Sequence, residues 1–471
     1  MAINKIKQGR WSRQIHLAAA GARAGFGWAG DQIITMGLPL EERELARSHR
    51  TQKQAENWVR QLGQLKGSIV KIGQILATYA DYCLPAPLAL ALHQLEADTE
   101  PLVWSVISTH IHKLLQGREQ ELIIEPVALA AASLSQVHVA RIKKDNRVIC
   151  LKILYPGIKK TLDSDLAVLD QGLRWWLDKN EQQRFSLWIV AIREVMLEEM
   201  DLKLEAIKLK HWKDRLENDV RYVVPIVENQ YCTSSILAMS FESGLVQHHE
   251  CIFALSQVRR DQLAKNMLEL FFREILLWGE MQTDPHPGNY RIRLNEEEGD
   301  QIVLLDFGSV KKIDNSLLQP LRRMIISAYR DDRGSLLEAI FSVGLLDRDT
   351  PLDAQQAFTD ILLGLVEPLN YRAKLIDNPH SIPTYAFDKE LNYCWSAAKL
   401  PKRMGKKAFK SAFSKNFSFP GTDFLLISRK LAGVYAFIAA LDARFDASYL
   451  IEKIIADMPA EYLGTNHHHV E

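Results

Sequence analysis

Three side chains that carry oxygen ligands flank one short segment of this sequence. Asp284 and Asn289 come just before residues 290–294, and Asp306 comes just after residues 301–305. Both arms have the composition of β-strands, and the acidic stretch between them is typical of a turn, so the segment predicts a β-hairpin. Because a hairpin returns the chain to where it started, we expect the three side chains to lie close together.

The chemistry that such a group suits is the binding of magnesium on a triphosphate. Mg²⁺ takes few carboxylate and amide oxygens from the protein, keeps several waters and binds phosphate oxygens. Asp284 and Asn289 are spaced like the aspartate and asparagine of a kinase catalytic loop, and residues 306–308 read Asp-Phe-Gly, the kinase metal-binding element. A turn rich in Asp, Pro and Gly that only caps helices is the alternative interpretation.

A phosphate site also needs a cation, and Lys152 is the candidate. It lies in an alternating apolar strand, residues 148–154, where a buried lysine needs an acidic partner. Kinases pair the equivalent lysine with the phosphates and with a glutamate on a nearby helix. Taken alone, Lys152 also fits an edge strand with its side chain in solvent. The helix predicted over residues 185–217 offers four acids, which are Glu194, Glu198, Glu199 and Glu205.

The segment before this strand is rich in alanine and stands where kinases place a Gly-rich loop over the phosphates. Alanine disfavours positive φ and makes the backbone stiffer than glycine does. We therefore expect the loop over the phosphates to be less flexible, and its contacts with nucleotide to differ from those of ordinary protein kinases. The start of an Ala-rich helix is the alternative that composition leaves open. The residues concerned are Ala130, Ala131, Ala132 and Ser133.

The elements predicted around these residues are mixed in the first half of the chain and mainly helical from residue 256 onward. A hairpin is predicted over residues 136–154, with its turn at residues 144–146, and short strands are predicted over residues 223–227 and 236–240. The distribution of helix formers and breakers predicts helices over residues 41–65, 68–82, 88–96, 163–177 and 185–217.

Composition excludes several classes of protein. The 471 residues include 58 Lys and Arg and 58 Asp and Glu, and this zero net charge predicts no nucleic-acid footprint. The five scattered cysteines form no C-x-x-C pair, which argues against a disulfide framework or zinc site and favours a reducing compartment. We expect no signal peptide and no transmembrane helix, because the most apolar stretches are interrupted by charge, residues 424–445 by Arg429 and Lys430 among others.

Six sequence blocks, in order, resemble the atypical kinase-like family that contains UbiB (the aarF type) and its mitochondrial relatives in coenzyme Q biosynthesis. The resemblance covers the chain from about residue 67 to about residue 445. The blocks are the K-x-G-Q signature at residues 71–74, the Ala-rich loop at 130–138, the lysine-bearing strand and Pro-Gly at 150–157, the helix motif with Glu199 and Glu205, the catalytic loop at 281–289 and the metal-binding motif at 305–308.

The resemblance implies an α+β, bilobal protein-kinase-like fold with a helical N-terminal extension that carries the K-x-G-Q motif. The implied domains are the extension over residues 1–116, a kinase-like N-lobe over residues 117–242 and a mainly helical kinase-like C-lobe over residues 243–471.

The resemblance also implies roles for the site residues. Lys152 would contact the phosphates of ATP or ADP and pair with Glu199, under the cover formed by the Ala-rich loop. Asp284 would hold the catalytic position, and Asn289 and Asp306 would hold Mg²⁺. Met239 would lie in the hinge between the lobes, beside the adenine.

A regulatory set, which comprises Lys71, Gln74 and Glu205, is implied as well. Lys71 and Gln74 are three residues apart and so share a helix face. In the family this helix folds over the active site where a protein substrate would dock, which implies ATPase or small-molecule chemistry more than protein phosphorylation. Without the resemblance, the two residues indicate only an exposed polar helix face. Glu205 matches a second family acid whose role is open.

The function that the resemblance implies is an ATP-binding, atypical kinase-like ATPase that supports ubiquinone or related isoprenoid-lipid biosynthesis. An active kinase for a protein or small molecule, and a non-enzymatic scaffold that retains nucleotide, are the alternatives. The implied partners are a lipid or quinone precursor, a membrane surface contacted peripherally by a cytoplasmic protein, and a biosynthetic protein complex. The substrate and the oligomeric state are left open.

Three positions depart from the common family pattern. Ser135 replaces a usual glycine in the Ala-rich loop, Lys208 stands where an asparagine is common, and Gln282 replaces a histidine found two residues before the catalytic aspartate in many members. None of them removes an expected phosphate or metal ligand.

Overall fold

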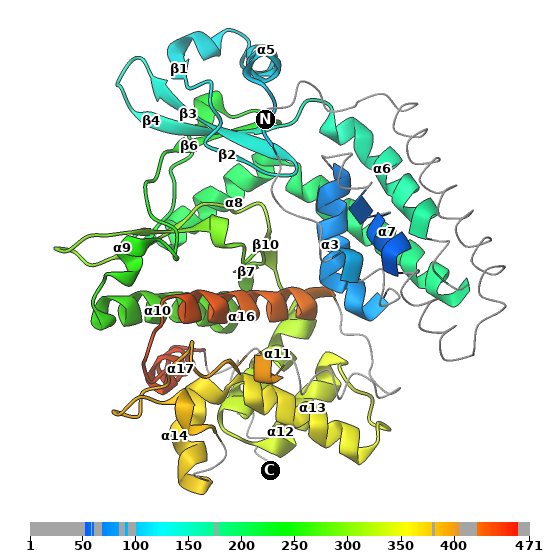
Figure 1. Cartoon of the computed structure of the whole chain (residues 1–471), viewed down its shortest axis with the longest axis vertical. Helices are drawn as coiled ribbons and strands as arrows, with labels where there is room; N and C mark the ends of the chain where they lie inside the picture. The colour runs from blue at the N-terminus through cyan, green and yellow to red at the C-terminus, as the bar shows by residue number, and fades with distance from the viewer. Residues whose placement is uncertain are drawn as a thin grey trace, which may run out of the picture. The chain divides into compact units, whose positions relative to one another are not determined.

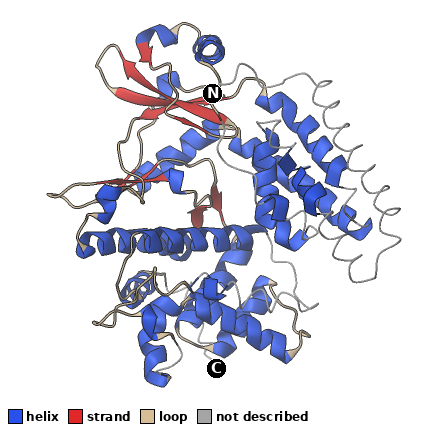
Figure 2. Cartoon of the chain, in the orientation of Figure 1, coloured by secondary structure: helices blue, strands red, loops and turns tan. Residues whose placement is uncertain are grey.

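The computed structural model describes two compact units with a mixed α and β composition (Figures 1 and 2). The first is drawn from Met1–His211 and Pro225–Phe241, and the second from Trp212–Val224 and Glu242–Glu471. The expected α+β class is confirmed. The residues described are 52–57, 59–60, 68–83, 90–92, 100–173, 177, 179–378, 382–400, 402–404 and 422–459.

The first unit contains an antiparallel five-stranded sheet (Figure 2). Its order is β1-β3-β4-β6, and β2 pairs with the other part of β3. The predicted hairpin over residues 136–154 is confirmed as β3 and β4, and Asn146 in its turn has a positive φ of 63°. The strands are β1 (Leu122–Ile124), β2 (Ala130–Ala131), β3 (Ser135–Ile142), β4 (Val148–Leu154) and β6 (Ile236–Ser240).

The Ala-rich segment is extended rather than helical. Ala130 and Ala131 pair with Val137 and Gln136 of β3. The main-chain N–H of Ala132 then donates to the carbonyl of Ser135 at 2.8 Å, which closes a tight turn into β3. The alternative of a helix start is therefore excluded.

The helices of the first unit differ from the prediction mainly at one break. The single helix expected over residues 185–217 is wrong, because the Asp201 carboxylate accepts the main-chain N–H groups of Lys203 and Leu204 at 3.1 and 3.2 Å and starts a new helix there. The elements are α3 (Ser68–Cys83), α5 (Trp104–Leu115), η2 (Arg118–Glu121), α6 (Ile158–Leu173), α7 (Lys179–Glu199), α8 (Leu202–Arg215, whose last turn belongs to the second unit) and η3 (Asn229–Tyr231).

Two predicted N-terminal helices lie largely outside the described residues. Of residues 41–65, residues 52–57 and 59–60 are described, and they are helical; of residues 88–96, residues 90–92 are described, and they are helical too. The helix predicted over residues 68–82 is confirmed as α3, which packs against α6 and α7.

The second unit is built around two small sheets. The predicted hairpin is confirmed as β8 (Tyr290–Arg293) and β9 (Gln301–Leu304), which are antiparallel with Tyr290 opposite Leu304. A strand from outside the hairpin, β5 (Tyr222–Val223), runs parallel to β9. The other sheet pairs β7 (Glu280–Gln282) with β10 (Val310–Lys312).

Helices make up the rest of the second unit. In Figure 1, α10 (green) and α16 (red-orange) run beside each other, and they are in contact. The elements are α9 (Glu250–Phe253), α10 (Gln257–Phe272), the π-helical η4 (Arg273–Trp278), η5 (Pro287–Asn289), α11 (Asn315–Tyr329), α12 (Arg333–Val343), α13 (Leu352–Leu365), α14 (Glu367–Asp377), η6 (Thr384–Ala386), α16 (Thr422–Ala440) and α17 (Ser448–Ala456).

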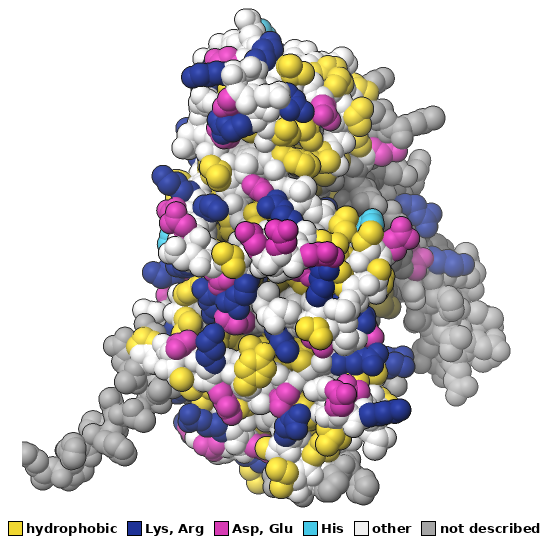
Figure 3. All heavy atoms as spheres, turned by 90° about the vertical axis from the view of Figure 1, so that its left-hand side faces the viewer, with side chains coloured by type: hydrophobic (Ala, Val, Ile, Leu, Met, Phe, Trp, Pro, Cys, Tyr) yellow, Lys and Arg dark blue, Asp and Glu magenta, His cyan; other side chains and the backbone are white. Residues whose placement is uncertain are grey.

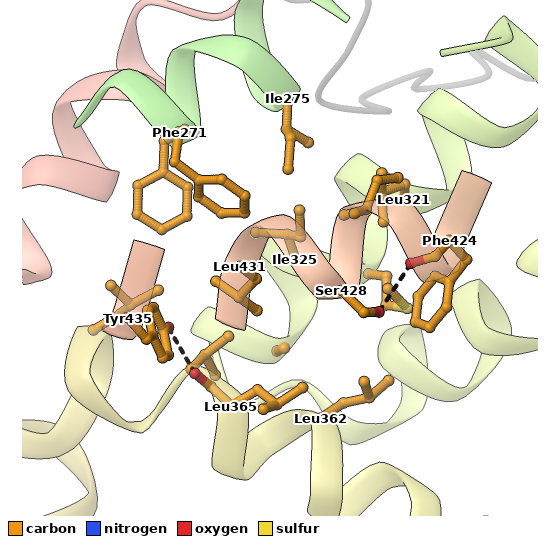
Figure 4. A pocket seen from close by; sticks show the side chains of 16 residues that line it. Phe271, Ile275, Leu321, Ile325, Leu362, Leu365, Phe424, Ser428, Leu431 and Tyr435 are labelled. Atoms are coloured by element: carbon orange, nitrogen blue, oxygen red, sulfur yellow. Dashed lines mark hydrogen bonds between the residues drawn. The ribbon is translucent and has the colours of Figure 1, made fainter. Parts of the chain in front are cut away.

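One face of α16 lines an apolar pocket of about 70 Å³ in this unit (Figure 4). Its two hydroxyl groups are already bonded, since Ser428 donates to the carbonyl of Phe424 at 2.9 Å and Tyr435 donates to that of Leu365 at 2.8 Å. This face therefore belongs to the apolar core of the unit, and the charged residues of α16 must point elsewhere.

Surface charge is mixed. On the face shown in Figure 3, acidic and basic side chains are interspersed over the described residues, with apolar side chains between them. In the part of the chain that the structure describes, no helix has both the length and the apolar character needed to cross a bilayer.

Candidate active site

The loop that carries Asp284 is tied down at both ends by main-chain hydrogen bonds. Thr283 donates its N–H to the carbonyl of Ser309 at 3.0 Å, and Leu305 donates to the carbonyl of Asn289 at 3.0 Å. These bonds extend the β7–β10 and β8–β9 pairings into the loops. The hairpin therefore sets residues 284–289 beside residues 305–309, as its spacing predicted.

Asn289 is fixed by Asp284. Its Nδ2 atom donates to the main-chain oxygen of Asp284 and to the Oδ2 atom of the same residue, at 3.2 Å each. Because the amide nitrogen faces Asp284, the amide oxygen is turned away from it. That oxygen is the atom a hard cation would use.

Asp306 is held by the turn that follows it. Its Oδ1 atom accepts the N–H of Gly308 at 2.8 Å. Phe307 is 1% exposed and packs against the ring of Trp212 with 5.6 Å between the centroids. Asn289 and Asp306 line the same small cavity, so the structure brings these two expected metal ligands together.

The donor set fits magnesium. An amide oxygen from Asn289 and a carboxylate from Asp306 are hard ligands, which Mg²⁺ prefers over nitrogen or sulfur. Among the residues that the structure describes, no group of three His, Cys, Asp or Glu side chains gathers as a metal cage. Two protein ligands suffice for a magnesium ion that binds phosphate oxygens and waters at its other positions.

In the first unit, Lys152 lies on an inner strand. It is opposite Val137 of β3 and Leu237 of β6, and its side chain is 16% exposed. Its Nζ atom donates to the Oε1 atom of Glu205, at 2.7 Å, and Glu205 is 2% exposed. The alternative of a solvent-facing lysine on an edge strand is therefore excluded.

The expected pairing of Lys152 with Glu199 is wrong. Glu199 forms an ion pair with Lys71 of α3 instead. The break before Asp201 explains the difference, because it places Glu199 at the end of α7 and Glu205 in the first turn of α8, so the two acids take different partners.

The K-x-G-Q helix therefore makes a specific contact. The side chains of Lys71 and Glu199 are 20% and 16% exposed, which does not match the alternative of a plain exposed polar face for Lys71. The side chain of Gln74 lies outside what the structure describes.

The other expected nucleotide contacts lie on the sheet of the first unit or in the turn between β2 and β3. Ala130 and Ala132 are exposed, Ala131 is half-buried and Ser133 is buried. Met239 lies on β6 opposite Cys150 and is 7% exposed. The structure thus gathers Lys71, Lys152, Glu199 and Glu205 within the first unit, and Asp284, Asn289 and Asp306 within the second.

Two residues near Asp284 were missed by sequence reasoning. The Nη2 atom of Arg429 lies 3.2 Å from the Oδ1 atom of Asp284. Its neighbour Lys430 is 1% exposed and pairs with the buried Glu274. Burial opposes the charge on Lys430, but Glu274 and Tyr290 together outweigh burial and raise the pKa of the lysine. The available signal was two adjacent cations inside an otherwise apolar helix.

Comparison with known proteins gives one family. The model of the ABC1 atypical kinase-like domain matches residues 98–340, more than half of the chain. The solved structure of the complex of Rv3197 with erythromycin, from Mycobacterium tuberculosis, shares the fold, with a TM-score of 0.53 and 22% identity over 88% of this chain and 98% of that one.

Curated proteins that are similar to this chain include atypical kinases, in agreement with the family model. The chloroplastic protein ACTIVITY OF BC1 COMPLEX KINASE 8 of Arabidopsis thaliana is 27% identical over 87% of this chain and 54% of its own length. The mitochondrial atypical kinase COQ8 of Saccharomyces cerevisiae is 26% identical over 78% and 72%, and the probable protein kinase UbiB of Cellvibrio japonicus is 26% identical over 65% and 57%. The chain thus spans about half to three quarters of the length of these relatives. It belongs to the ABC1 family of atypical kinases, of the UbiB and aarF type.

Proposed function

We propose that this chain binds ATP with Mg²⁺ and hydrolyses it, in support of ubiquinone or a related isoprenoid-lipid pathway. The observation that carries the proposal is the hairpin β8–β9, which gathers Asp284, Asn289 and Asp306 into one loop cluster. Family membership supports the nucleotide, and the names of the yeast and Cellvibrio relatives support the pathway.

In this proposal the chain adopts the bilobal kinase arrangement, with the extension over residues 1–116, the N-lobe over residues 117–242 and the C-lobe over residues 243–471. Lys152, already poised by Glu205, binds the phosphates. The turn from Ala130 to Ser133 covers them, and Met239 lies beside the adenine.

The chemistry is attack of water on the γ-phosphorus. A bond forms between the water oxygen and phosphorus, the bond to the β–γ bridging oxygen breaks, ADP leaves, and Asp284 accepts the proton of the water. Asn289 and Asp306 would hold Mg²⁺, which when bound would supply neutralisation of the charge on the phosphates. Most of the acceleration would come from positioning and charge stabilisation.

The engagement of Glu199 supports ATPase over ordinary protein-kinase chemistry. Kinases pair the strand lysine with a helix glutamate when active; here Lys152 has such a partner in Glu205, while Glu199 pairs with Lys71 and so ties the K-x-G-Q helix to α7. We propose that Lys71 and Gln74 restrain the site and that Glu205 serves as the acid for Lys152.

The test is a titration of the full chain with ATP in the presence and absence of Mg²⁺. In Asp306→Asn the Mg²⁺-dependent part of the affinity should vanish, while Asp349→Asn, an exposed carboxylate in the same unit, should bind like the parent. If Asp306→Asn binds Mg²⁺-ATP as tightly as the parent, the metal assignment is wrong.

The pathway needs a separate experiment. Lipid quinones and their precursors should be compared by mass spectrometry in cells with and without this chain. Loss of a quinone with accumulation of its precursor supports the proposed pathway, and unchanged levels of both contradict it.

A further inference from the structure

A buried polar cluster lies behind the loop of Asp284. Lys430 of α16 directs its Nζ atom to the Oε2 atom of Glu274 at 3.4 Å, to the Oε1 atom of Gln282 at 3.2 Å and to the hydroxyl oxygen of Tyr290 at 3.0 Å. The exposed fractions of the four residues are 1% for Lys430, 1% for Glu274, 6% for Gln282 and 7% for Tyr290. Four elements, η4, β7, β8 and α16, meet in this cluster.

The cluster matches the needs of a buried ammonium group. A lysine has three donors and no acceptor, and the three neighbours supply three oxygens. A buried charge without such partners is strongly unfavourable. The lysine therefore fixes the positions of these oxygens as much as they fix the lysine.

The orientation of the Gln282 amide follows from this arrangement. Its Oε1 atom accepts from Lys430 and, at 2.9 Å, from the hydroxyl group of Tyr290. A flipped amide would set its NH₂ group against two donors, so the amide nitrogen must face the other way. There it donates to the main-chain oxygen of Asp284 at 2.7 Å.

The same oxygen of Asp284 also accepts from the amide nitrogen of Asn289. The peptide of the catalytic position is thus held by one amide from each end of the loop. Lys430 and Tyr290 together orient the amide of Gln282 on β7, so a residue about 150 positions further along the chain, on α16, contributes to this contact.

We propose that Lys430, paired with Glu274, is a positioning residue that fixes the catalytic loop through Gln282. Its buried side chain lines the same small cavity as Asn289 and Asp306, and it acts on Asp284 and Asn289 through the oriented amide of Gln282. The inference concerns loop geometry; its bearing on catalysis rests on the proposed function.

The test uses the double variant Lys430→Met with Glu274→Gln. It removes both charges together, which avoids an unpaired buried charge, and it keeps an oxygen at position 274. Hydrogen exchange in the peptide covering residues 283–290 should become at least about tenfold faster. If the parent binds Mg²⁺-ATP, the double variant should bind Mg²⁺-ATP about tenfold more weakly than the parent does. Both proteins should bind ATP without Mg²⁺ equally tightly.

The matched control is the double variant Arg403→Met with Glu367→Gln. In this pair, which lies in the second unit, Glu367 is buried and Arg403 is half-buried, and both are bonded to Tyr393 rather than to the catalytic loop. It should lower thermal stability to a similar degree and leave exchange over residues 283–290 unchanged. Equal acceleration in both double variants would show a general loss of stability and would overturn the inference.

A milder variant guards against failure of folding. Tyr290→Phe deletes one hydroxyl group of the cluster and should raise exchange over residues 283–290 about threefold. Parental exchange in a folded Lys430 double variant, or in Tyr290→Phe where the double variant does not fold, overturns the positioning role. A parent that binds no nucleotide would refute the proposed function alone, because the exchange measurement does not depend on nucleotide.

Discussion

Lys71 of the K-x-G-Q helix forms an ion pair with Glu199 at the end of α7, while Lys152 of the sheet pairs with Glu205 in the next helix. The break between α7 and α8 thus determines which glutamate pairs with which lysine. Lys71 of α3 and Lys152 of β4 therefore belong to separate ion pairs, and the coupling energy within a pair can be measured.

The first prediction concerns the pairing of Lys71 with Glu199. Lys71→Met and Glu199→Gln should each lower the free energy of unfolding by about 1–2 kcal/mol, and the double variant should lose little more than either, because both changes delete one partly buried pair. Chemical denaturation of the four proteins gives the coupling energy. Glu198→Gln is the control, since Glu198 is 49% exposed in its pair with Lys208 and should cost under about 0.5 kcal/mol. Additive losses at Lys71 and Glu199 would contradict the pairing.

The second prediction concerns Lys152. Lys152→Met combined with Glu205→Gln should weaken ATP binding about tenfold, because a charge-assisted contact to phosphate is lost while no buried charge is left unpaired. Calorimetric titration measures it. Lys159→Met, an exposed lysine that donates to the carbonyl of Ser234, should bind like the parent. Parental affinity in the double variant would remove Lys152 from the phosphate site.

The third prediction compares two glycines in helices of the second unit. A Cβ atom on Gly433 of α16 would collide with the ring of Pro285, next to Asp284, whereas one on Gly364 of α13 would meet the flexible end of Met404. Gly433→Ala should therefore destabilise by about 1–3 kcal/mol, since a proline ring in a fixed loop cannot move aside. Gly364→Ala should cost clearly less, because the methionine can rotate. Thermal unfolding of both variants measures the two losses of stability. Equal losses would contradict the prediction and would show that α16 can shift away from Pro285.

The fourth prediction concerns acid stability. Burial raises the pKa of Asp219, but hydrogen bonds from Arg221 and Arg273 outweigh it and lower the pKa to about 2 from its ordinary 3.8. A carboxyl group whose pKa is lowered in the folded state stabilises the protein at every pH above its ordinary pKa. This contribution is lost as the pH falls from about 4 toward 2.

Asp219→Asn should therefore be less stable than the parent by about 2 kcal/mol at pH 6, and the two should converge near pH 2. Urea unfolding at several pH values measures the difference. Asp331→Asn, an exposed carboxylate in the same unit, is the control and should track the parent throughout. A difference between Asp219→Asn and the parent that does not shrink below pH 4 would exclude the charge as its cause.

Local pattern is enough to predict the hairpins. The arms that form β8 and β9, and the strands that form β3 and β4, are predicted within one or two residues, because alternation and turn residues act between neighbours in sequence. The same locality explains why the hairpin pattern alone predicts that Asp284, Asn289 and Asp306 converge.

The break at Asp201 is harder to predict. Residues 185–217 are rich in helix formers, and propensity alone favours one helix; the Asp201 side chain caps a new helix by bonding main-chain groups two and three residues ahead. Because a single helix is expected there, Glu199 rather than Glu205 is the partner predicted for Lys152. A short polar residue inside a helical pattern is the local sign of the break.

The sequence by itself determined which residue types stand at the turns of the hairpin, and hence the oxygen ligands around Asp284 and the lysine on β4. Only the tertiary structure decided that Glu205 rather than Glu199 meets Lys152, that β5 joins β9, and that Lys430 lies buried behind Gln282. Neighbouring residues are constrained by backbone geometry, whereas partners tens to more than a hundred residues apart are chosen by packing, which no local pattern encodes.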